Sequence, residues 1–360
     1  MYDPRNILTW LEENVQMRQS RRKTAAHLVS GVMQLQGTGV LALGRAMEGP
    51  AKAKHRIKRV DRFLGNEQVE TEALSAALFH QLRPRTGRLV VLADWTDRHD
   101  FQQLVLALPR QGRALPFWSM TVPKGDGSGE HDGWMIHAEA EALKTLERFC
   151  QEAITPVVIA DRGFGNTRWL EQIQNRGWYF VQRLACNHRV DVEEHIGAMS
   201  ELGIRRGWRA RDWGWGTMGE KQWGPLRLVT VFGRENKEPW YLVTNLEAEP
   251  PAEIVRLYQR RMWIEAAFRD FKNRNWGMGM DRVRLTQRAR IDRHFIVLAL
   301  AYMFLFAFGA AAETQGLGDQ LKANTVSERV LSLARIGNYF LQTAQLAIPY
   351  AIQALLELPT

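Results

Sequence analysis

Arg88-Leu-Val-Val-Leu-Ala-Asp94 and Pro156-Val-Val-Ile-Ala-Asp161 are the two stretches that decide the fold. Each is a short apolar run that ends in one aspartate, which is typical of a strand buried on both faces of a sheet. The residues around them predict strands 88–94, 101–108, 114–122, 156–161 and 177–183, and helices 134–149 and 167–176. This β-β-β-α-β-α-β order predicts an α/β fold with a mixed five-stranded sheet and helices on both faces.

Helical and β-rich segments flank the predicted sheet. Residues 1–80 have helical apolar spacing and predict a small basic helical domain. Residues 186–249 are rich in Trp and Gly and contain alternating segments, which predicts a β-rich insertion. Pro250-Pro251 opens a long helix from about Ala252 to Asn273, because proline is tolerated in the first turn. The predicted organisation is 1–80, 81–185 (first part of the core), 186–249, 250–312 (second part of the core) and 313–360 (C-terminal helices).

The stretch from Phe295 to Ala312 has 18 residues without a formal charge. That is the lower limit for a membrane span. A helix buried on all sides of a large domain has the same composition. The sequence favours the buried core helix, and a membrane-associated protein anchored by this stretch is the alternative.

The positive charge of the chain is concentrated in two blocks. The net charge is +9 over 360 residues, and eleven Lys or Arg face only Glu48 and Asp61 between Arg18 and Arg62. A second basic block runs from Arg256 to Arg293. Basic surfaces interleaved with apolar residues predict a polyanionic partner, with nucleic acid favoured over a solvated helix face. The expected N-terminal DNA contacts are Lys52, Lys54, Arg56, Lys58, Arg59 and Arg62.

The overall composition is that of a globular protein in a reducing compartment. Apolar residues make up 45% and charged residues 24%, which excludes a disordered or collagen-like chain. The two cysteines, Cys150 and Cys186, are too few for a disulfide framework or a thiolate zinc site. No basic leader followed by an apolar run opens the sequence, so we expect a cytoplasmic protein.

Asp94 and Asp161 are candidate metal ligands because each ends a predicted strand. Ligands in α/β sheets gather at such strand ends. If the two strands are neighbours, the carboxylates converge, repel each other and need a divalent cation to stay ionised. The alternative for each aspartate is a helix cap or a turn former.

A third acid, Glu265, lies on the long helix predicted after Pro251. Tyr258, Arg261, Glu265 and Lys272 fall within an arc of about 60° on a continuous helix at roughly 100° per residue. Such a polar stripe suits a metal ligand flanked by phosphate contacts. An amphipathic helix with its own salt bridges remains the alternative.

These residues, in this order, resemble the DDE transposases of the bacterial insertion-sequence group with a Tyr-x2-Arg-x3-Glu-x6-Lys signature. The segment from Tyr258 to Lys272 fits that signature without a gap. Asp94-Trp-Thr96 resembles the first-aspartate motif of the family, and Asp161-Arg-Gly-Phe-Gly165 the second. The resemblance covers residues 50–312 and leaves the last fifty or so unmatched.

The resemblance implies an RNase H-like catalytic core and a helical N-terminal domain that reads transposon ends. Asp94, Asp161 and Glu265 would bind two Mg²⁺ ions, with Mn²⁺ able to substitute. The reaction would be strand cleavage, with a hairpin intermediate, followed by strand transfer into target DNA. The expected DNA contacts in the core are Tyr258, Arg261, Lys272, Arg269, Thr96, Arg162 and, stacked on a flipped base, Trp240.

The implied partners are terminal inverted repeats and target DNA, bound by a homodimer in the bacterial cytoplasm, close to the nucleoid. Two other functions remain open. One is an RNase H-like nuclease or resolvase that cuts without strand transfer, although such enzymes lack the Tyr–Arg–Glu–Lys helix. The other is a domesticated, non-catalytic DNA-binding protein, although all three acids are present.

Overall fold

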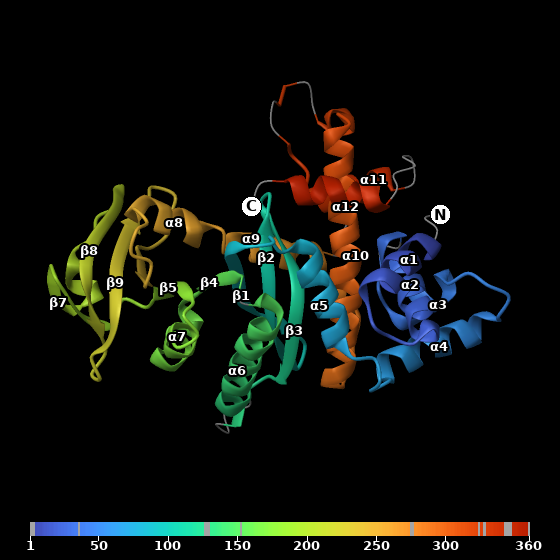
Figure 1. Ribbon diagram of the computed structural model, residues 1–360, viewed down its shortest axis with the longest axis horizontal. Coiled ribbons are helices and arrows are strands. Elements are labelled where there is room, and N and C mark those ends of the chain that lie inside the picture. Colours follow the sequence, from blue (N-terminus) through green and yellow to red (C-terminus); the bar gives the residue numbers. More distant parts are fainter. Residues whose placement is uncertain are drawn as a thin grey trace. The chain divides into compact units, whose positions relative to one another are not determined.

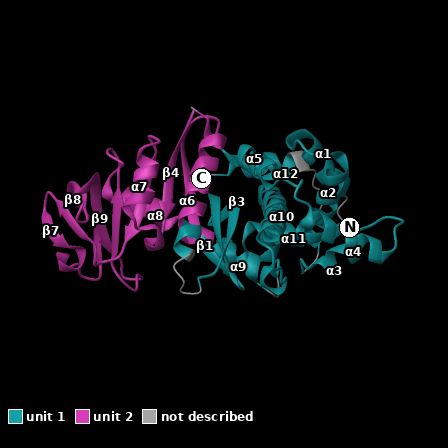
Figure 2. Cartoon of the chain, turned by 90° about the horizontal axis from the view of Figure 1, so that it is seen from below, with its two compact units in different colours: residues 1–83, 95–135, 265–360 teal, residues 84–94, 136–264 magenta. Residues whose placement is uncertain are grey.

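The computed structural model describes residues 4–34, 37–125, 130–151, 153–273, 277–322, 325–326, 329–341 and 348–358. The chain forms two compact units, which Figure 2 shows in different colours. Unit 1 comprises residues 1–83, 95–135 and 265–360, and unit 2 comprises residues 84–94 and 136–264. Strand β1 (Gly87–Arg98) and helices α6 (Glu130–Cys150) and α9 (Met262–Lys272) each contribute to both units.

The N-terminal part of unit 1 is helical, as predicted for residues 1–80. The helices are α1 (Pro4–Asn14), α2 (Gln19–Gln34), α3 (Val40–Ala46), α4 (Ala53–Gly65) and α5 (Thr71–Leu82). Each helix buries an apolar face, and Val29, Val60 and Leu78 are fully buried. The basic residues of α4 remain outside this core, so the helix is amphipathic.

Helix α10 (Arg288–Thr314) is the centre of unit 1. It contacts strand β3 and helices α11 and α12, the last two of which cross it in Figure 1. The other elements of unit 1 are β2 (Phe101–Arg110), β3 (Arg113–Pro123), α11 (Leu333–Phe340), α12 (Ile348–Glu357) and the short 3-10 turns Met280–Arg282 and Leu317–Leu321. Gly309 on α10 and Gly337 on α11 permit close packing, because a Cβ at either would overlap backbone of the other helix.

Within the described ranges, α10 is the one helix that is long and apolar enough to span a membrane. Its most apolar window has a mean hydropathy of 2.3 and is entirely buried in the structure. The stretch Phe295–Ala312 is therefore buried, as predicted. The apolar composition reflects this burial on all sides.

Unit 2 is built on a mixed sheet in the order β1-β4-β5-β10-β9-β8-β6-β7. Strands β4 (Ile154–Ala160) and β5 (Tyr179–Leu184) run parallel to β1, whereas β10 pairs with β5 antiparallel. The remaining strands are β6 (Arg189–Val192), β7 (His195–Ala198), β8 (Trp208–Met218), β9 (Trp223–Phe232) and β10 (Trp240–Thr244). The β-rich insertion thus continues the sheet edge to edge beyond β5, although the sequence predicts it as a separate segment.

Short helices complete unit 2. They are α7 (Thr167–Gln174), α8 (Pro251–Gln259) and the 3-10 turns Arg162–Phe164 and Met199–Leu202. The mixed α/β architecture is confirmed, and its assignment to the RNase H-like class stays a prediction. Strand β1 also runs on to Arg98, four residues past the end that the sequence predicts at Asp94.

The prediction of one continuous helix from Ala252 to Asn273 is wrong. The chain forms α8 and α9, separated by a turn at Arg260 and Arg261. The amides of Arg260, Arg261, Trp263 and Ile264 bond to carbonyls three residues earlier, a tighter pattern than an α-helix. The four signature residues consequently do not lie on one continuous helix: Tyr258 belongs to α8, Arg261 to the turn, and Glu265 and Lys272 to α9.

Candidate active site

Asp94 lies within β1 and Asp161 directly follows β4, at the same level of these two parallel strands. Strands β1 and β4 pair in register as far as Ala93↔Ala160. Asp94 and Asp161 are the residues that come next, at the level where β4 ends and β1 runs on. The two strands are therefore neighbours, which is the condition under which the sequence predicts converging carboxylates, and ligands gather at such strand ends in α/β sheets.

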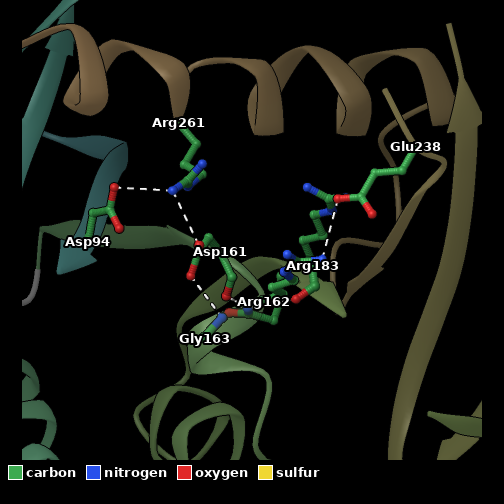
Figure 3. A network of polar contacts seen from close by, with 8 residues as sticks. Asp94, Asp161, Arg162, Gly163, Arg183, Glu238 and Arg261 are labelled. Carbon is green, nitrogen blue, oxygen red and sulfur yellow. Dashed lines mark hydrogen bonds and ion pairs between the residues drawn. The ribbon is translucent and has the colours of Figure 1, made fainter. Parts of the chain in front are cut away.

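The guanidinium of Arg261 lies between the two carboxylates (Figure 3). Its Nη2 donates to Oδ2 of Asp94 at 3.2 Å and to Oδ2 of Asp161 at 3.3 Å. The side chains of Arg261 and Asp94 are each 9% exposed, and that of Asp161 is 32% exposed. A cation in this position offsets the repulsion between the buried carboxylate of Asp94 and the partly exposed one of Asp161. Three predicted site residues therefore meet within one unit.

The two oxygens of Asp161 have different partners. Oδ1 accepts from the amide of Gly163 at 2.8 Å and caps the 3-10 turn that follows β4. Gln182 on β5 donates to the carbonyl oxygen of Asp161 and fixes its backbone. Because Oδ2 faces Arg261, the capping role uses one oxygen and leaves the other directed at the site. The turn-forming alternative and a ligand role are thus compatible.

A second ionic cluster lies beside Asp161. Oε1 of Glu238, in the loop between β9 and β10, accepts from Nη2 of Arg183 at 2.7 Å and from Nη1 of Arg162 at 3.3 Å. Figure 3 shows both arginines reaching the same carboxylate. Arg162 is the residue after Asp161, and Arg183 follows Gln182 on β5. The cluster is therefore attached to the two strands that carry Asp161 and its backbone donor.

Tyr258 and Trp240 form an aromatic pair at this end of unit 2. Their ring centroids are 5.0 Å apart, with the planes at 73°. Tyr258 is fully buried, and burial raises its pKa to about 12, so the hydroxyl stays protonated. Trp240 is partly exposed at the start of β10. Tyr258 thus supports Trp240 from inside, and contact between Tyr258 and a phosphate stays a prediction.

The rest of the signature belongs to unit 1. Glu265 and Arg269 are exposed on α9, and Lys272 at its end is partly exposed. Thr96, in the part of β1 that belongs to unit 1, is 5% exposed. The structure therefore places Glu265 in a different unit from Asp94, and the meeting of the three acids stays a prediction.

Asp270 anchors α9 inside unit 1. It is 3% exposed, and its Oδ2 accepts from the hydroxyl of Tyr302 at 2.7 Å and from Nε of Arg113 at 2.9 Å. Tyr302 lies on α10 and Arg113 starts β3. These bonds hold the helix that carries Glu265 against the buried helix of the unit.

Most of the predicted N-terminal contacts are exposed on or just before α4. The exposed ones are Lys52, Lys54, Lys58, Arg59 and Arg62. Arg56 is half-buried and donates to the carbonyl oxygen of Met47 at 2.5 Å, so it also stabilises the fold. The exposed set offers a basic surface of the kind that tracks a DNA backbone.

Two residues of the site were missed by reasoning from sequence. Arg183 ends the strand predicted at 177–183, as Asp94 and Asp161 end their predicted strands, so the same pattern offered a signal for it. Glu238 has no such signal, because it lies in a polar loop. Its role depends on two arginines that are 76 and 55 positions away in the chain.

The site fits a divalent cation in part. Asp94 and Asp161 supply converging carboxylate oxygens, which are the ligands that Mg²⁺ prefers. The guanidinium of Arg261 now binds both carboxylates at the position that the metal ion would take. Among the residues that the structure describes, no three His, Cys, Asp or Glu side chains form a group that could hold a metal ion. Within unit 2 the structure thus provides two of the three predicted ligands.

The middle of the chain matches a known family. Residues 136–304 match the family model described as the transposase DDE domain. The matched range includes Asp161, Arg261 and Glu265 and begins after Asp94. This similarity suggests a transposase, an enzyme of the nuclease type. No curated protein sequence matches the chain significantly.

Proposed function

We propose that the chain is a DDE-type DNA transposase that binds transposon ends, cuts them and joins them to target DNA. The observation that carries the proposal is the convergence of Asp94 and Asp161 on Arg261 of the Tyr–Arg–Glu–Lys signature. The match to the transposase DDE domain supports it, because the matched range includes two of these residues.

Asp94, Asp161 and Glu265 would hold two Mg²⁺ ions, which Mn²⁺ could replace. When bound, such ions supply Lewis-acid activation of a water or a 3′-hydroxyl and stabilise the leaving oxygen. The protein residues position the DNA: Arg261 and Lys272 hold phosphates in line for displacement, with Arg269 and Arg162 beside them. Trp240 stacks on a flipped base, and stacking of about 1–3 kcal/mol offsets the unstacking in a hairpin.

The basic face of α4 binds the terminal inverted repeats of the element, because phosphate contacts by Lys and Arg supply most of the affinity of such surfaces. The protein works as a homodimer assembled on two ends, in the bacterial cytoplasm close to the nucleoid. The high net charge of +9 favours association with a polyanion.

The test uses a supercoiled plasmid that carries the DNA flanking the gene, with its inverted repeats, incubated with the purified protein and Mg²⁺. We expect double-strand breaks at the repeat ends, hairpin ends on the excised fragment, and strand transfer into a second plasmid. Asp94→Asn, Asp161→Asn and Glu265→Gln should each lower the cleavage rate by at least about a thousandfold while end binding persists. The reason is that loss of one metal ligand raises the activation barrier by several kcal/mol.

Glu247→Gln is the matched control, because Glu247 is an exposed acid in the loop after β10. It should cleave like the wild type. Metal-dependent cleavage by Glu265→Gln at the wild-type rate would reject the assignment of that residue. Cutting without joining would instead support a nuclease or resolvase, and end binding without cutting by the wild type would support a domesticated DNA-binding protein.

A further inference from the structure

Glu238 occupies a position that suits a phosphate. A single oxygen of its carboxylate accepts from the guanidinium groups of both Arg162 and Arg183. Arginines that converge from two elements on one anionic oxygen are the arrangement by which proteins bind a phosphate. A carboxylate and a phosphate oxygen accept the same hydrogen bonds, so they compete for the pair.

The cluster lies next to the proposed chemistry. Arg162 follows Asp161 directly, and Arg183 follows Gln182, which donates to the Asp161 backbone. All of these residues belong to unit 2 and lie in the same field of Figure 3. A phosphate held by the two arginines would therefore be close to Asp161.

Glu238 can be displaced because its bonds are largely at the surface. The side chains of Glu238 and Arg162 are 52% and 56% exposed, whereas Arg183 is 14% exposed. Exposed ion pairs are weak and are screened by salt. The more buried Arg183 stays in place, so departure of Glu238 uncovers a fixed cation rather than a mobile one.

We infer that Glu238 is an internal competitor for a DNA phosphate at the Arg162–Arg183 pair, and that it lowers the affinity of the protein for DNA. The inference rests on the proposed function for its partner and adds a residue that regulates access to it. With Glu238 in place the three side chains carry a net charge of +1, and without it the pair presents +2 to the DNA backbone.

The experiment measures binding of a fluorescein-labelled, mixed-sequence 40-base-pair duplex by anisotropy, in EDTA so that no cleavage occurs, over a range of salt concentrations. Glu238→Gln should bind about three- to tenfold more tightly than the wild type, because two weak competing ion pairs are lost. Its plot of log affinity against log salt should be steeper by about 0.9, the value for one more neutralised phosphate.

Two controls separate this effect from a general change in charge. Glu247→Gln removes the same charge from an exposed position and should leave the affinity within about twofold of the wild type. Adding Arg183→Gln to Glu238→Gln should cancel most of the gain, since the more buried arginine of the pair is then lost and only Arg162 remains to bind the phosphate. Thermal melting confirms that each variant is folded.

Equal affinities for Glu238→Gln and Glu247→Gln would overturn the inference. Weaker binding by Glu238→Gln would also overturn it, because Glu238 would then be needed to position the arginines. If the wild type binds and cleaves end DNA, either result leaves the proposed function standing. A wild type that binds no DNA would reject both.

Discussion

Nη2 of Arg261 lies 3.2 Å from Oδ2 of Asp94, although 167 positions separate the two residues in the chain. The same nitrogen also reaches Asp161. The signature arginine is thus the counter-ion of two predicted metal ligands. A divalent cation and this guanidinium require the same carboxylate oxygens, so binding of one opposes binding of the other.

Replacing Arg261 should therefore strengthen metal binding in the absence of DNA. We expect Arg261→Gln to bind Mn²⁺ about tenfold more tightly than the wild type, equivalent to about 1.4 kcal/mol. Electron paramagnetic resonance of unbound Mn²⁺ measures this directly. Arg256→Gln, on the exposed face of α8, is the matched control and should not change the affinity. Unchanged or weaker Mn²⁺ binding by Arg261→Gln would show that the guanidinium does not compete with the ion.

The exposed basic residues of α4 should contribute phosphate contacts. Changing Lys54, Arg59 and Arg62 together to Gln should weaken duplex binding and lower the slope of log affinity against log salt by about 2 to 3, since each contact contributes about 0.9. The comparison variant carries Lys144→Gln and Lys221→Gln together. Both lysines are exposed in unit 2, so this variant removes positive charge away from α4. Binding that matches this comparison variant would mean that the N-terminal helices read something other than DNA.

The hydroxyl of Tyr302 should stabilise unit 1 through Asp270. Tyr302→Phe leaves a 3% exposed carboxylate with one donor fewer, which costs about 1–3 kcal/mol of unfolding free energy. Urea unfolding at neutral pH measures the loss. Tyr339→Phe removes a hydroxyl from a residue that is 58% exposed and should be neutral. Equal stability of the two variants would contradict the anchoring role of Asp270.

His294 should make the protein less stable in acid. Its Nδ1 accepts from Arg98 at 2.7 Å and its Nε2 donates to the carbonyl oxygen of Thr38 at 3.0 Å, so the ring is neutral. Burial, and then the charge of Arg98, lower the pKa of His294 from 6.5 to about 3. The unfolded chain therefore binds a proton before the folded protein does, and stability falls as the pH drops from about 6.5 towards 3.

Unfolding in urea between pH 7 and 4.5 measures this contribution. His294→Gln should lose less stability than the wild type over that range, by about 1.4 kcal/mol for each pH unit below 6. The buried Asp292 has the opposite dependence, because burial raises its pKa from 3.8 to about 6 and its contribution falls as the pH rises. It is common to both proteins and cancels in the comparison. The exposed His137→Gln variant should follow the wild type, and a His294→Gln profile parallel to both would reject the assignment.

The apolar strands that lead to Asp94 and Asp161 and the burial of Phe295–Ala312 were accessible from the sequence because they are local patterns. An apolar run of β-branched residues predicts a buried strand wherever it occurs. An uncharged apolar helix is stable in water only when other elements of the protein bury it on all sides. The spacing from Tyr258 to Lys272 is likewise a property of neighbouring residues. These features required no knowledge of which elements meet.

The interruption of that helix at Arg260 and the continuation of the sheet beyond β5 were not accessible in the same way. Helical propensity is similar on both sides of the turn, so no local pattern predicts the break. Pairing of β10 with β5 joins residues about sixty positions apart, and no local pattern specifies such a partner.

The sequence by itself therefore determined which side chains carry the charge and which apolar runs form strands. Only the tertiary structure decided that Arg261 pairs with Asp94 and Asp161, and that Glu238 pairs with Arg162 and Arg183. The physical reason is that an ion pair depends on distance through space, and residues far apart in the chain acquire that distance only when the sheet is assembled.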